Sequence, residues 1–118
     1  PIQYALTYPK RMHLDMKHLD FKELLTLEFM PPRVDDFPAL NLAYEVGKIG
    51  GFKPAVFNAA NETAVYAFLD GKIIFSDIYK IVTAVLESMG RDDDFTLDNL
   101  LAIDQWARIK ASEFINRR

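Results

Sequence analysis

The distribution of proline is the feature of this sequence that most constrains its fold. Five of the six prolines lie at or before residue 38, namely Pro1, Pro9, Pro31, Pro32 and Pro38. Proline has no backbone N–H and clashes with the preceding turn of a helix, so it resists helix interiors. The first third of the chain is therefore predicted to be mostly extended or turned, and the long helices are expected from Phe37 onward.

Two short elements are predicted within the proline-rich part. Pro1–Tyr8 can form a short helix that stops before Pro9. Residues 25–30 place apolar side chains at alternate positions, beginning with Leu25, and this period of two predicts a strand with one buried face. The sequence offers no second strand to pair with it. An unpaired strand leaves its backbone hydrogen bonds unmet, so we expect its partner to lie outside this chain.

The remaining two thirds have the pattern of four helices, expected at about residues 38–49, 54–69, 77–89 and 97–118. Proposed N-caps are Asp36, Ser76 and Thr96, and glycines at 50–51, 71 and 90 are placed to end the first three helices. The third helix has a regular apolar stripe, made of Ile78, Ile81, Val82, Val85, Leu86 and Met89. The stripe of the fourth is less regular: Leu97, Leu100, Leu101, Ala107 or Arg108, Ala111, Phe114 and Ile115.

These elements predict a mainly α fold. A compact antiparallel four-helix bundle at residues 38–118 is preceded by an extended linker at residues 10–37, which carries the unpaired strand at 25–30. Residues 1–9, with the short helix, form a separate leading piece. The chain opens without methionine, and we expect it to be a piece of a longer protein.

Composition excludes several classes of function. The chain has no cysteine, which removes disulfides, thiolate catalysis and sulfur-bound zinc. A net charge of −3 argues against a nucleic-acid-binding protein and suits a cytoplasmic one. The longest uncharged stretch, Pro1–Pro9, is far shorter than the roughly 18 apolar residues of a membrane span. We therefore expect neither nucleic-acid nor membrane partners.

The most visible polar cluster is Asn58, Asn61 and Glu62, which helical spacing places on one face. It could be a ligand or partner site. The alternative that we favour is a buried hydrogen-bond network that fixes how helices meet, because buried amides must be paired. The alanines around the cluster support this, since small side chains let another helix approach: Ala55, Ala59, Ala60, Ala64 and Ala67.

Asp104 lies on the apolar stripe of the last helix, where a buried carboxylate would need a hydrogen-bond partner, such as a helix N-terminus or an asparagine on another helix. A catalytic role is possible, but the sequence identifies no partner acid, base or nucleophile. The neighbouring Trp106 and Arg108 are expected to serve in packing and surface pairing.

Two acidic or histidine-containing segments raise the possibility of a metal site. His13 and His18 accompany Asp15 and Asp20, but a spacing of five residues does not place the histidines on one face of a helix or strand. The aspartates at 92–94 lack the spacing and closing glutamate of a calcium-binding loop. We therefore predict no metal ligand, and no catalytic or cofactor-binding residue, in this chain.

Several segments, in order, resemble the 1-deoxy-D-xylulose 5-phosphate reductoisomerase family. They are residues 1–9 (PIQYALTYP) with Arg11, 19–21 (LDF), the predicted strand, 36–40 (DFPAL), 42–45 (LAYE), Gly50-Gly51, 57–62 (FNAANE), 67–69 (AFL), 75–78 (FSDI) and 104–108 (DQWAR). No single segment is specific, but the ordered set covers essentially the whole chain. Two departures, Ala39 in place of a common cysteine and Lys10 in place of a common acid, fall outside functional positions.

The resemblance implies that this chain is the end of the catalytic domain, the linker and the C-terminal helical domain of such an enzyme. The family converts 1-deoxy-D-xylulose 5-phosphate to 2-C-methyl-D-erythritol 4-phosphate in the non-mevalonate isoprenoid pathway, using NADPH and a divalent metal, Mg or Mn. Its nucleotide, metal and phosphate sites precede the matching region, so no functional residue carries over. The chain alone is expected to be inactive, to brace the catalytic domain as its partner, and to form a homodimer when isolated. A stand-alone helical interaction module and an enzyme using Glu62 or Asp104 are the alternatives.

Overall fold

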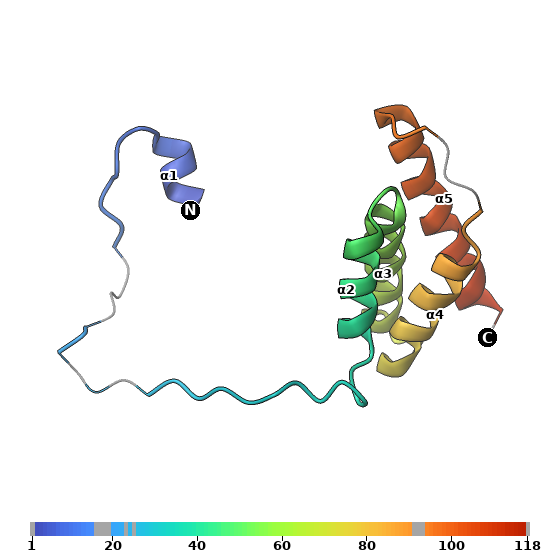
Figure 1. The fold of residues 1–118 in the computed structure, drawn as a ribbon, viewed down its shortest axis with the longest axis horizontal. Helices are drawn as coiled ribbons and strands as arrows, with labels where there is room; N and C mark the ends of the chain where they lie inside the picture. Colours follow the sequence, from blue (N-terminus) through green and yellow to red (C-terminus); the bar gives the residue numbers. More distant parts are fainter. Residues whose placement is uncertain (1, 16–19, 23, 25, 91–93, 118) are drawn as a thin grey trace. The chain divides into compact units, whose positions relative to one another are not determined.

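The structure, a computed structural model, describes residues 2–15, 20–22, 24, 26–90 and 94–117. The chain divides into two compact units, Pro1–Pro31 and Pro32–Arg118. Figure 1 follows the chain through both units. The fold is mainly α, as predicted, and every regular element within the described ranges is a helix.

The first unit contains the short helix α1 (Ile2–Thr7). Side chains hold the turn after it, since Gln3 Nε2 donates to the Met12 carbonyl over 2.9 Å and the guanidinium of Arg11 lies 4.4 Å from the centre of the Tyr4 ring. The helix ends before Pro9, as the sequence predicts. No residue of α1 is buried, so little holds it beyond these local contacts.

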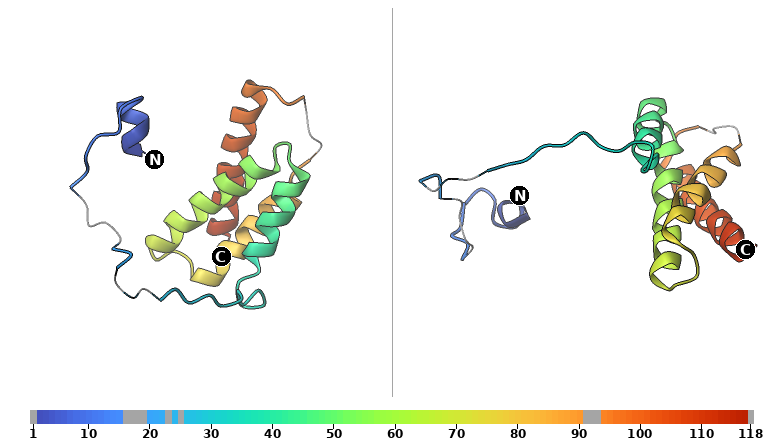
Figure 2. Two further views of the ribbon diagram at one scale, coloured as in Figure 1. Left: turned by 60° about the vertical axis from the view of Figure 1, so that its left-hand side comes forward. Right: turned by 90° about the horizontal axis from the view of Figure 1, so that it is seen from below.

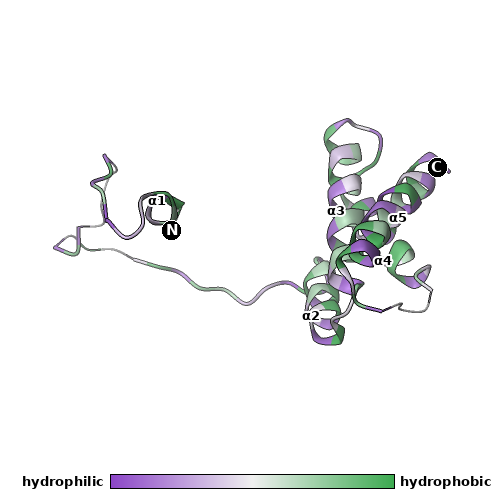
Figure 3. Cartoon of the chain, turned by 90° about the horizontal axis from the view of Figure 1, so that it is seen from above, coloured by the Kyte–Doolittle hydropathy of each residue, from purple (hydrophilic) through white to green (hydrophobic). Residues whose placement is uncertain are grey.

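The strand predicted at residues 25–30 is not formed in the part of this range that the structure describes. Residues 26–30 have no regular structure, and Leu25 lies outside the described residues. Leu27 and Phe29 are 80% and 90% exposed, so the expected buried face is absent here as well. A strand needs a neighbour to pair its N–H and C=O groups, and the alternation of side chains alone does not supply one. Figure 3 shows that hydrophobic residues recur along the extended segment before α2.

The second unit is the predicted four-helix bundle, made of α2 (Ala39–Ile49), α3 (Lys53–Leu69), α4 (Phe75–Glu87) and α5 (Leu97–Asn116). Consecutive helices run in alternating directions, as the two views of Figure 2 show. Helix α3 is central, because it packs against all three of the others, most extensively against α4 and α5.

Small side chains allow this central position of α3. Ala59, Ala60 and Ala64 are fully buried, and on α5 Ala107 and Ala111 are buried equally completely. Side chains with a single methyl group let two helix backbones approach closely and leave few bulky groups to fit. The alanine pattern around the polar cluster therefore predicted close packing of helices correctly.

The apolar stripe of α4 is confirmed, whereas that of α5 is only partly right. Ile81, Val82 and Val85 are buried, and the same core is contacted by Ile78, Leu86 and, beyond the end of α4, Met89. In α5, Leu97 and Leu101 are 69% and 62% exposed. The α5 residues in the core begin at Ile103, because this helix meets its neighbours through its later turns.

Three predictions about where the helices begin and end were wrong. Thr96 is the N-cap of α5 as predicted, with its hydroxyl accepting from the Asn99 N–H over 3.2 Å. Asp36 and Ser76, however, are not caps: α2 begins after Pro38, and α4 begins after Ile74. Helix α4 also ends at Glu87, two residues earlier than predicted. The positive φ angles of Gly50 and Gly71, both 71°, fit their predicted role as helix ends.

None of the helices that the structure describes is long and apolar enough to cross a membrane.

Candidate functional site

The predicted polar cluster on α3 is arranged differently from the expected buried network. Asn58 is exposed, whereas Asn61 and Glu62 are half-buried. The Glu62 carboxylate does not bind the two asparagines and instead forms an ion pair with Arg108 on α5. Glu62 therefore contacts another helix, but its side chain is 43% exposed and the three side chains do not form the predicted buried network. The reason is that a carboxylate gains more from a guanidinium on a neighbouring helix than from an amide on its own.

Arg108 on α5 is paired with two carboxylates, one on α3 and one on its own helix. Its Nη2 lies 2.6 Å from Glu62 Oε2, and its Nε lies 2.8 Å from Asp104 Oδ2. The hydrogen bonds to Asp104 and then to Glu62 raise the pKa of the guanidinium above its ordinary value. Arg108 thus stays charged and joins α3 to α5, in agreement with the predicted surface pairing.

Asp104 is less buried than its position on the apolar stripe suggested. Its side chain is 36% exposed, and its partner is Arg108 on the next turn rather than a helix N-terminus or an asparagine. The half-buried Trp106 packs against the core, as predicted. Glu62 and Asp104 both face one cation, an arrangement that suits a structural ion pair.

Asp77 is a buried polar residue that the sequence patterns did not single out. It is 4% exposed, and its carboxylate accepts from the Ile74 N–H over 3.4 Å and from Lys80 Nζ over 3.2 Å. The first contact closes the start of α4 and helps to explain why this helix begins at Phe75. The signal was present in the sequence, because an acid at the third position of a helix often binds the N-cap N–H.

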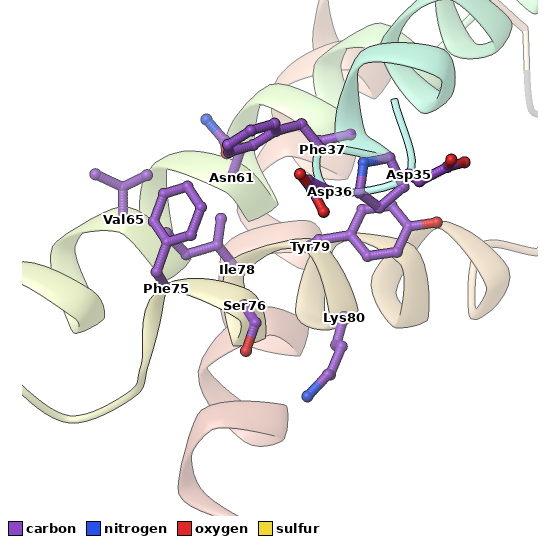
Figure 4. Close-up of a pocket in the computed structure, with 12 residues that line it drawn as sticks. Asp35, Asp36, Phe37, Asn61, Val65, Phe75, Ser76, Ile78, Tyr79 and Lys80 are labelled. Atoms are coloured by element: carbon purple, nitrogen blue, oxygen red, sulfur yellow. The ribbon is translucent and has the colours of Figure 1, made fainter. Parts of the chain in front are cut away.

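A cavity of about 430 Å³ lies where the segment before α2 meets α3 and the first turns of α4. Phe37, Phe75 and Tyr79 converge on it together with Asn61, as Figure 4 shows. Asn61 is thus the only member of the predicted polar cluster that lines it. Sequence patterns did not locate this cavity, because its lining residues come from three separate stretches of the chain.

The candidate metal residues do not form a ligand cluster where the structure places them. Within the described ranges, no group of three or more histidine, aspartate or glutamate side chains is arranged to hold a metal ion. His13, Asp15, Asp20 and Asp94 belong to these ranges, whereas His18, Asp92 and Asp93 lie outside them.

The fold and these contacts define a helical bundle domain in which one ion pair, Arg108 with Glu62, joins α3 to α5. The family model described as the DXP reductoisomerase C-terminal domain matches residues 1–110. The 1-deoxy-D-xylulose 5-phosphate reductoisomerases of Desulforamulus reducens and Halothermothrix orenii are 48% and 45% identical to the chain, over 98% and 96% of its length. The chain spans 30% and 29% of those two relatives.

Solved structures show the same relationship. The reductoisomerase of Zymomonas mobilis in complex with NADPH is 46% identical, with a TM-score of 0.81 over 97% of this chain and 30% of that one. A DOX-P reductoisomerase in complex with NADPH, fosmidomycin and magnesium is 34% identical, with a TM-score of 0.82 over 98% of this chain and 30% of that one. This chain therefore belongs to the 1-deoxy-D-xylulose 5-phosphate reductoisomerase family, as its C-terminal domain.

Proposed function

We propose that this chain is the C-terminal structural part of a reductoisomerase that converts 1-deoxy-D-xylulose 5-phosphate to 2-C-methyl-D-erythritol 4-phosphate in the non-mevalonate isoprenoid pathway. The observation that carries the proposal is the family match over residues 1–110 in a chain that spans only 30% of its relatives. A biosynthetic enzyme of this kind also suits a cytoplasmic location.

The cofactors belong to the rest of the enzyme in this proposal. Solved relatives are in complex with NADPH and with magnesium. The described residues of this chain do not fit a metal site, because they bring no three potential ligands together. We propose that NADPH and the divalent metal, Mg or Mn, bind to the part of the enzyme outside this chain, which is about 70% of the Desulforamulus reducens relative.

The mechanical role of the chain is to brace the catalytic domain. Residues 1–9 end that domain, residues 10–37 form a linker, and residues 38–118 form the bracing bundle. The linker has 28 residues and could span at most roughly 90 Å when extended, which is enough to cross a domain. The bundle is suited to bracing, because its alanine-rich core packs the helices closely and the Arg108–Glu62 ion pair joins α3 to α5. We infer that it limits the geometry in which the enzyme closes over its substrate.

Deleting residues 38–118 from the full-length enzyme tests this role. We expect a lower melting temperature or a lower kcat, while the Kd for NADPH stays within about twofold, because nucleotide contacts lie elsewhere. Unchanged melting and turnover would refute bracing. The separate 118-residue chain should show no NADPH oxidation with substrate and metal, and measurable turnover would refute the assignment of chemistry to the missing part.

We further propose that the isolated chain forms a homodimer. Several large apolar side chains of its first unit are almost fully exposed, including Phe21 at 87%, Leu24 at 96% and Phe29 at 90%. Exposed apolar surface of this kind promotes association. Light scattering should give about twice the monomer mass, and a monomer at micromolar concentration would contradict the proposal.

A further inference from the structure

We propose that the cavity beside the first turns of α4, called the α4 cavity below, receives an apolar side chain from the part of the enzyme outside this chain. This inference rests on the proposed function and deepens it, because it names the surface through which the bundle is held. The α4 cavity is lined from three directions, by the segment before α2, by α3 and by α4.

The walls of the α4 cavity are apolar and partly open to solvent. Phe75 and Phe37 are 60% and 47% exposed, whereas Val65, Ile78 and Tyr79 are half-buried. Figure 4 shows these side chains around one hollow. Exposed aromatic side chains that rim a half-buried apolar floor are typical of the pockets that receive an anchoring side chain in protein interfaces.

The apolar surface continues beyond the cavity along the turn between α3 and α4. The rings of Phe68 and Phe75 are in edge contact, with centres 5.9 Å apart. Leu69 and Ile74 beside them are 69% and 65% exposed. Exposed apolar residues that gather on one turn mark an interaction surface more often than scattered ones do.

The charged groups at the cavity favour an apolar protein side chain over a small charged metabolite. Asp36 is paired with Arg33 over 3.3 Å, and Lys80 is paired with Asp77 over 3.2 Å. Lys80 is the cation of the lining and is already paired, whereas Asp35 and Asp36 are acidic and would repel a phosphate or carboxylate ligand. Half-buried Asn61 offers both a donor and an acceptor, which suits the peptide group of an incoming chain segment.

The missing part of the enzyme is the occupant that the chain length supports. The chain spans 30% of the Desulforamulus reducens relative, so the other 70% of such an enzyme lies outside it. The α4 cavity includes residues 35–39, which lie near the start of the second unit and lead into α2. A bracing domain must be held by its surroundings, and this apolar site lies at the point where the chain enters the domain.

A single thiol provides the test, because the chain has no cysteine of its own. Phe75→Cys is compared with Ile109→Cys on α5, a residue that is 55% exposed and does not line the cavity. The rate of labelling by N-ethylmaleimide at each position is measured by mass spectrometry, in the isolated chain and in the full-length enzyme. We expect position 75 to react on the order of tenfold or more slowly in the full-length enzyme, since a covered thiol reacts only when the interface opens.

Position 109 should react at similar rates in both proteins. Equal rates at position 75 would overturn the proposal, and so would strong protection of position 75 in the isolated chain at high concentration, which would indicate a second copy as occupant. A second readout uses Phe75→Gln in the full-length enzyme, which should lower the melting temperature more than Ile109→Gln does. If deletion of the bundle impairs the enzyme while both tests at position 75 are negative, the proposed function stands and only this docking site is refuted.

Discussion

Close contact between α3 and α5 leads to a quantitative prediction about Ala107. This residue is fully buried against the core, and replacing it by leucine adds three carbon atoms where the helices meet. Overpacking a well-filled core typically costs about 1–3 kcal/mol. We therefore expect Ala107→Leu to lower the free energy of unfolding by about 2 kcal/mol, and the melting temperature by about 8–16 °C for a bundle of this size.

The matched control is Ala102→Leu, which makes the same chemical change at an exposed position of the same helix. Leucine and alanine have similar helix propensities, so this variant should melt within about 3 °C of the unchanged chain. Thermal melting followed by circular dichroism, with urea unfolding as a second measurement, compares the two. Equal destabilisation by both variants, or none by either, would show that α3 and α5 are not packed as closely as the structure indicates.

Three further predictions concern local contacts. Arg108→Met removes both ion pairs of that residue and should cost about 1 kcal/mol in urea unfolding, with a smaller loss in 1 M salt because the pairs are half-exposed; a loss unaffected by salt would contradict this. Lys110 lowers the pKa of the Glu113 carboxyl, chiefly through a hydrogen bond. The ionised Glu113 therefore stabilises the fold at pH values above its unfolded pKa, and this stabilisation is lost as the pH falls through the lower folded pKa. NMR titration should place the Glu113 midpoint below that of an ordinary glutamate. Gly71→Ala, at a φ of 71°, should destabilise by about 1 kcal/mol, whereas Gly47→Ala inside α2 should stabilise by a similar amount, as judged by melting; destabilisation by both would contradict the backbone argument.

Local sequence signals predicted the helices well because those signals act within a few residues. The prolines confined the long helices to the last two thirds, the glycines at 50 and 71 marked two helix ends, and Thr96 capped α5. The wrong cap at the start of α4 arose because two neighbouring residues, Ser76 and Asp77, could each have bound the free backbone N–H groups there. Asp77 closes the start of α4 from inside the helix, so Ser76 is not needed as its cap.

The predicted strand shows the limit of a periodic pattern. Alternating apolar residues describe what a strand would present to a sheet, but a strand forms only when a neighbour pairs with its backbone. Residues 26–30 remain without regular structure in the described part of the first unit. The same limit applies to Asp104, whose place on the stripe suggested burial although its side chain is 36% exposed and paired with Arg108.

The sequence by itself determined where the helices lie and, through its ordered segments, the family to which the chain belongs. Only the tertiary structure decided that Glu62 meets Arg108, that Leu97 and Leu101 face solvent, and that residues near 37, 61 and 75 enclose one cavity. The physical reason is the distance along the chain over which each interaction acts. Caps, prolines and glycines act on adjacent backbone groups, whereas burial and pairing depend on how whole helices cross, which no short stretch of the chain specifies.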